Sequence, residues 1–104
     1  MLQPAGLILG LTAFLSIWLG HVLVRELEYR MAWLPWPLFL TAGLAAEAAA
    51  LLVRDRLAGG VLGIVGMTLL WDALEFGRQE RRVRRGHAAA NPANPRHRRL
   101  LEGR

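Results

Sequence analysis

Three long stretches of the sequence carry almost no charge, and this pattern constrains the fold more than any other feature. Residues 4–24 contain no charged side chain, residues 31–53 contain only Glu47, and residues 57–76 contain two acids near their end. An α-helix needs about 20 apolar residues to cross a hydrocarbon layer about 30 Å thick. A helix of a soluble protein carries a charged face instead. The sequence therefore predicts an all-α integral membrane protein with three transmembrane helices.

The charges are concentrated in the connectors and in the C-terminal tail. Residues 77–104 hold nine arginines against two glutamates. With three spans, this tail and the first connector, residues 25–30, lie on one side with eleven arginines, against two on the other. The side richer in arginine is normally cytoplasmic. We expect a transmembrane domain over residues 1–76 with its N-terminus outside, followed by an Arg-rich cytoplasmic tail over residues 77–104.

No pattern of a soluble enzyme is present. The chain has no cysteine, which excludes a disulfide scaffold. It has no phosphate-cradling glycine loop, no dinucleotide fingerprint and no nucleophile elbow. Residues 1–24 lack the basic start of a signal peptide, so we interpret them as a helix of the mature protein. The sequence predicts a protein that is not an enzyme.

His21 lies near the cytoplasmic end of the first stretch. Arg25 follows four residues later and Glu28 seven residues later, so the three share one face if the helix continues. A histidine at this depth can transfer protons, bind a metal or ligate a tetrapyrrole, or it can hydrogen-bond an acid and hold helices together. Ligation of a haem by two histidines would require a homodimer. We expect no cofactor, with haem or metal at His21 left open.

Two further acids lie at the depth of His21. Asp72 and Glu75 are three residues apart on one helix face. An unpaired imidazole there would lose its solvation without compensation, so we expect His21 within hydrogen-bonding or ion-pair reach of Glu28, Asp72 or Glu75. The cluster fits a salt-bridge network, an entry site for protons or cations, or a divalent metal site.

Glu47 is an intramembrane acid, one to two turns inside the outer end of the second stretch. It could reach Arg54, or pass a proton if it is buried and neutral. Residues 42–50 are nearly all small, which favours close helix packing within one chain or between copies. Matching small faces are supplied by Gly6, Gly10, Gly59, Gly63 and Gly66.

The tail begins as a basic helix that we expect Gly86 to end. Two Asn-Pro pairs then favour turns or extended structure over residues 88–99. Arginines beside a membrane attract anionic lipid headgroups, whereas a nucleic acid partner is not expected because the tail lacks aromatic residues. The predicted headgroup-binding residues are Arg78, Arg81, Arg82, Arg84 and Arg85.

A set of residues spread over all three apolar stretches and the tail forms a recognisable sequence pattern. It comprises His21 with Glu28-Tyr29, Trp36 with Phe39 and Gly43, Gly63 with Gly66, Trp71 with Glu75, Gln79-Glu80 and Asn91-Pro92. This pattern resembles a family of small prokaryotic membrane proteins catalogued only as a domain of unknown function, over residues 6–92. The resemblance implies a protein of the prokaryotic cytoplasmic membrane and lends no mechanism.

The chain departs from the family pattern at three single positions and in residues 87–90, which replace an aromatic-Pro stretch. Val22 replaces a proline, Asp72 replaces a small polar residue, and Glu47 replaces an apolar or small one. These departures favour His21, Glu28 and Glu75 as the shared functional groups. We expect a non-enzymatic accessory or structural subunit that oligomerises or joins a larger membrane complex. The alternative is a small homo-oligomeric transporter or channel for protons or cations.

Overall fold

The computed structural model describes residues 2–102 and is built from helices. These are α1 (Ala5–Met31), α2 (Trp36–Leu52), α3 (Arg56–Arg84) and α4 (Pro95–Glu102), and no strand occurs within residues 2–102. The all-α prediction is confirmed. Two helices, α1 and α3, are long and apolar enough to span a membrane, and α2 is a shorter apolar helix.

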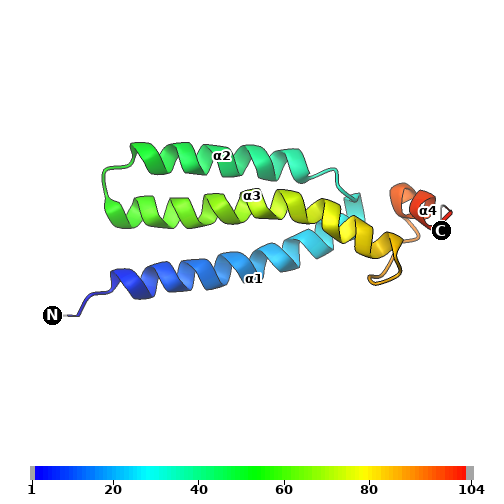
Figure 1. The fold of residues 1–104 in the computed structure, drawn as a ribbon, viewed down its shortest axis with the longest axis horizontal. Helices are drawn as coiled ribbons and strands as arrows, with labels where there is room; N and C mark the ends of the chain where they lie inside the picture. Colours follow the sequence, from blue (N-terminus) through cyan, green and yellow to red (C-terminus); the bar gives the residue numbers. More distant parts are fainter. Residues whose placement is uncertain (1, 103–104) are drawn as a thin grey trace.

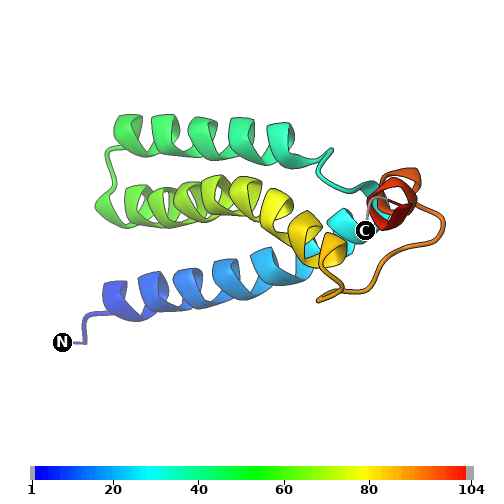
Figure 2. The ribbon, with the colours of Figure 1, turned by 45° about the vertical axis from the view of Figure 1, so that its right-hand side comes forward.

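The three long helices form one flat layer with α3 in the middle (Figure 1). The molecule measures 60 × 25 × 17 Å along its principal axes. Helix α3 packs against both α1 and α2, which lie on opposite sides of it. The N-terminus and the α2–α3 connector lie at one end of the layer. The α1–α2 turn lies at the other end, and Figure 2 shows the chain after α3 turning back so that α4 sits beside this turn.

Helix α1 runs through the segment that we expected to be a connector, residues 25–30. Neither glycine nor proline occurs between Gly20 and Met31, and Glu26 pairs with Arg30 one turn later at 2.7 Å. The helix ends at Ala32, which has a positive φ of 56° and donates its N–H to the Glu28 carbonyl at 2.7 Å. The first apolar helix is therefore longer than its apolar stretch.

Helix α2 begins at Trp36, and our expectation of a helix from residue 31 is wrong. A proline disfavours helical geometry in the residue before it, which here is Leu34 ahead of Pro35. Pro37 falls in the first turn, where no N–H is needed. The resulting 17 residues span about 26 Å, somewhat less than the hydrocarbon layer of about 30 Å.

Helix α3 is continuous across the boundary that we expected between residues 76 and 77. It starts where the Asp55 carboxylate accepts the N–H of Ala58 at 3.0 Å. It ends before Gly86, whose φ is 81°. The N–H of Gly86 bonds to the Val83 carbonyl at 3.1 Å, and the N–H of the next residue bonds to the Arg82 carbonyl at 2.8 Å. These two bonds form a Schellman motif, which requires the left-handed conformation that glycine adopts freely.

Small residues bring α2 and α3 together within the chain. A Cβ atom on Gly43 would lie 2.9 Å from the Gly66 carbonyl oxygen, and one on Gly66 would lie 3.1 Å from the Ala46 Cβ. Around Gly6, Gly10 and Gly63 the space is open. The small residues of α2 thus serve internal packing, whereas Gly6 and Gly10 of α1 remain uncovered.

The apolar core lies toward the α4 end of the layer. Phe76 is fully buried and meets Phe39 edge-to-face, with ring centroids 5.0 Å apart. Val24 and Ala73 complete this cluster, so all three long helices contribute to it. The packing fixes the end of the bundle on which the polar residues described below are assembled.

Candidate functional site

A layer of buried polar side chains lies at the α4 end of the molecule. Its members come from α1, α3 and the tail, and each exposes less than a tenth of its surface. They are Glu28, Asp72, Glu75, Gln79, Glu80, Asn94 and His97.

The innermost pair joins α1 to the tail. His97 Nε2 and Glu28 Oε2 are 2.6 Å apart, and both residues are completely buried. The other ring nitrogen, Nδ1, accepts the backbone N–H of Asn91 at 2.9 Å. A nitrogen that accepts a hydrogen bond carries no proton, so the proton of the neutral ring is on Nε2 and is donated to Glu28. This arrangement holds the His97 ring in one tautomer, with Nε2 donating to the buried Glu28 carboxyl group.

Two asparagines fasten the tail to the end of α1. The side-chain amides of Asn91 and Asn94 both donate to the Tyr29 carbonyl, at 2.9 and 3.2 Å. The Asn94 side-chain oxygen Oδ1 accepts the N–H of Arg96 at 3.0 Å and so caps α4. The exposed carbonyls at the end of α1 are therefore satisfied by the tail.

An ion pair ties α4 to α3. Arg96 donates from Nη2 to Glu80 Oε1 at 2.9 Å and from Nε to both carboxylate oxygens at 3.3 Å. Hydrogen bonding to Glu80 raises the pKa of Arg96 above its usual value, which keeps the guanidinium charged. The Arg96 guanidinium also lies 5.8 Å from the ring centre of Trp33. The tail thus contacts α1, α3 and the turn between α1 and α2.

The structure divides the predicted cluster of His21, Glu28, Asp72 and Glu75. Glu28 pairs with the tail, and Glu75 accepts a hydrogen bond from the guanidinium of the next turn at 2.9 Å. Within residues 2–102 the His21 ring has no hydrogen bond or ion pair. The separation of seven positions between His21 and Glu28 corresponds to about 10 Å along a helix, which keeps the two apart. His21 and Asp72 together line a cavity of about 320 Å³ between α1 and α3.

Glu47 points into the α2–α3 interface and not toward Arg54. A Cβ on Gly66 would lie 2.5 Å from Glu47 Oε1, which shows how closely the carboxylate approaches α3. This oxygen is buried and has no hydrogen-bond partner among the described residues. The small residues that allow α2 and α3 to approach each other also leave room for this acid.

The predicted lipid-binding arginines lie in the last turns of α3 and, for Arg85, directly after its end. Arg78 donates to Glu75 and lies over the Trp71 ring at 4.6 Å from its centre. Arg82 donates to the Gln79 side-chain oxygen at 2.9 Å. All of the five predicted residues are exposed, and they are Arg78, Arg81, Arg82, Arg84 and Arg85.

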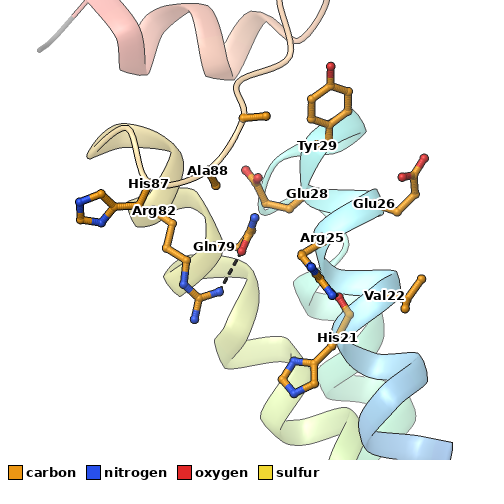
Figure 3. A pocket seen from close by; sticks show the side chains of 11 residues that line it. His21, Val22, Arg25, Glu26, Glu28, Tyr29, Gln79, Arg82, His87 and Ala88 are labelled. Carbon is orange, nitrogen blue, oxygen red and sulfur yellow. Dashed lines mark hydrogen bonds between the residues drawn. The ribbon is translucent and has the colours of Figure 1, made fainter.

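A cavity of about 940 Å³ lies between α1, α3 and the loop that follows α3 (Figure 3). His21 and Arg25 reach into it from α1, and Gln79 and Arg82 line it from α3. The lining residues are His21, Val22, Arg25, Glu26, Glu28, Tyr29, Gln79, Arg82, His87, Ala88 and Ala89.

The described residues do not form a metal-ligand set of three histidine, aspartate or glutamate side chains. The exposed ring of His21 offers one nitrogen ligand per chain near Asp72.

Sequence reasoning missed the docked tail. We expected turns or extended structure over residues 88–99, but α4 begins within this range, at Pro95. The order Asn94-Pro95 was the available signal, because asparagine is a preferred N-cap and proline a preferred first helical residue. No local signal pointed to the pairing of His97 with Glu28, which lies 69 positions away.

The sequence matches the model of one protein family. The model described as "Domain of unknown function (DUF4491)" matches residues 3–96. The chain belongs to the DUF4491 family. No curated protein and no solved structure matches it. The DUF4491 region includes α1, α2, α3 and both asparagines of the tail, and it ends one residue before His97.

Proposed function

We propose that this chain is a non-enzymatic accessory or structural subunit of a membrane, which oligomerises or joins a larger membrane complex. The observation that carries the proposal is the apolar surface left on the flat layer, since α1 and α2 flank α3 without covering each other. The accessible surface is 7272 Å², against about 5,800 Å² for a compact soluble protein of this mass. The large exposed apolar side chains include Leu7, Leu11, Phe14, Trp18, Leu38, Leu44, Met67 and Leu74.

The charge distribution supports three spans in the prokaryotic cytoplasmic membrane. Within residues 2–102, only Arg54 and Arg56 lie at the end of the layer where α1 begins, and the other ten arginines lie beyond the apolar segments toward the opposite end. The positive-inside rule then puts the N-terminus outside and the tail in the cytoplasm. Helix α2 is short, but Trp33 precedes it and Trp36 begins it, and tryptophan favours the interface where such a helix would end.

The absence of native cysteine makes the topology directly testable. We expect a Gln3→Cys variant to react with an impermeant thiol reagent in intact cells, and a Gly103→Cys variant to react only after permeabilisation. Mass measurement in lipid nanodiscs should then show a homo-oligomer or a co-purifying partner. A strict monomer without a partner would contradict the subunit role, and the reverse labelling pattern would contradict the topology.

A second candidate function is the transfer of protons or cations by a homo-oligomer. It is favoured by the cavity that His21 and Asp72 share and by the buried, unpartnered oxygen of Glu47 in the other helix interface. Purified protein in proteoliposomes should then dissipate an imposed proton or cation gradient, and Asp72→Asn should abolish the flux while Glu26→Gln preserves it. If liposomes with the wild-type protein lost the gradient no faster than liposomes without protein, this candidate would be eliminated.

A further inference from the structure

The cavity of about 940 Å³ contains positive charge that side chains within residues 2–102 do not fully neutralise. Of its two acids, Glu26 pairs with Arg30 at 2.7 Å and Glu28 is engaged with His97 at 2.6 Å. Arg25 has no ion pair within residues 2–102, and its guanidinium makes only a long contact of 3.4 Å to the His21 carbonyl. An unpaired guanidinium beside a cavity is suited to an anionic ligand.

The second arginine of the cavity is held in position from its own helix. Arg82 Nη1 donates to the Gln79 oxygen at 2.9 Å, and its Nη2 lies 3.7 Å from Glu75. A guanidinium has five N–H donors, so most donors of Arg82 stay available. Arg25 and Arg82 come from different helices, and both line the same cavity.

The cavity lies at the boundary between the apolar and the charged parts of α1. His21 and Val22 belong to the uncharged segment, and Arg25 is the first charged residue of the chain. Ala88 and Ala89 form a wall on the side of the tail. The volume of about 940 Å³ is within the usual range for small-ligand sites, about 300–1,000 Å³. A ligand with an anionic group and an apolar body fits this combination.

We propose that this cavity binds the phosphate group of an anionic phospholipid, with Arg25 and Arg82 as donors to its oxygens and His21 as a further donor. Arginine binds phosphate through paired, charge-assisted hydrogen bonds. The site differs from the general attraction of the tail for anionic lipid, because it requires two arginines from two helices. The lipid as ligand rests on the membrane placement proposed above. Free phosphate shares the same chemistry, and the experiment separates the two sources.

The test is native mass spectrometry of the full chain in detergent, with phosphatidylglycerol, phosphatidylcholine or inorganic phosphate added. The test variant is Arg25→Gln with Arg82→Gln. The matched control is Arg98→Gln with Arg99→Gln, which removes the same charge from exposed residues that lie outside the cavity and outside the predicted headgroup-binding set. The circular dichroism of both variants must match that of the wild type. A single Arg82→Gln change covers the case in which the double test variant misfolds.

We expect both the wild type and the control variant to retain one molecule of phosphatidylglycerol per chain. The test variant should lose at least about tenfold in occupancy, the contribution of one charge-assisted hydrogen bond. Displacement of the lipid by millimolar phosphate would show that the site accepts free phosphate as well. Equal retention by both variants, or equal retention of phosphatidylcholine, would overturn the proposal. Fractionation of the cells separates these results from a failure of the membrane placement, because only the latter leaves the protein soluble.

Discussion

His97 and Glu28 form the contact on which docking of the tail most depends. Both residues are completely buried, and each ring nitrogen of His97 has one partner. A buried carboxylate without its donor is strongly destabilising. The remaining Glu28 oxygen, Oε1, is buried without a hydrogen-bond partner in the described part of the chain. Loss of the bond to His97 would therefore leave both carboxyl oxygens of Glu28 without a hydrogen-bond donor from the described residues.

Replacing Glu28 with glutamine should loosen the tail. The change removes the charge from the bond to His97, which we expect to reduce the free energy of docking by about 1–2 kcal/mol. Hydrogen exchange at the Arg98 amide, which is bonded to the Asn94 carbonyl at 3.1 Å, measures this loss. The control is Glu26→Gln, which affects a surface pair worth less than about 1 kcal/mol. Similar exchange rates in the two variants would contradict the central role of Glu28.

At the scale of helices, the closest approach lies between α2 and α3. We expect Gly43→Ala to destabilise the protein by about 1–3 kcal/mol, because the new Cβ would press on the Gly66 carbonyl and on Leu70. Gly63→Ala places the same methyl group in open space and should be neutral or slightly stabilising. Unfolding of both variants in detergent measures the difference. An equal effect at the two positions would argue against this packing.

The end of α3 offers a second test with a matched control. Gly86 has a φ of 81°, where a Cβ atom costs about 1–2 kcal/mol. Gly77 is inside the helix, with no atom near the position of its missing Cβ. We expect Gly86→Ala to increase protease cleavage of the following loop and Gly77→Ala to leave cleavage unchanged. If both variants are as resistant as the wild type, the Schellman motif does not determine the course of the tail.

Sequence patterns predict the helices better than their ends. The uncharged stretches locate α1 and α3, since few structures other than helices can accommodate about 20 consecutive apolar residues. They do not locate the start of α2, which depends on Pro35 and on the turn at Ala32. Counting along the helices places Glu28, Asp72 and Glu75 at one end of the bundle. It cannot show that Glu28 faces the tail, because that depends on how residues 85–94 fold back.

At the scale of the whole molecule, the three-helix layer should not need the tail. The contacts of α3 with α1 and α2 lie largely outside residues 87–104, and seven arginines against two remain after the tail is removed. We expect a chain ending at Gly86 to keep its helical content apart from α4. It should also keep its orientation, measured by labelling of the Gln3→Cys variant. Inverted or mixed labelling would show that the distal arginines determine the topology.

The central position of α3 has a consequence for the order of biosynthesis. A ribosome releases α1 first, yet the long helix that α1 packs against most extensively is the last of the three. At about 5–20 residues per second, the 53 residues from the end of α1 to the end of α3 take roughly 3–10 s. During this interval α1 is without its partner, whereas α2 and α3 are consecutive and can pair as soon as both have emerged. Assembly then ends when α1, the first helix to be synthesised, packs against α3, the last.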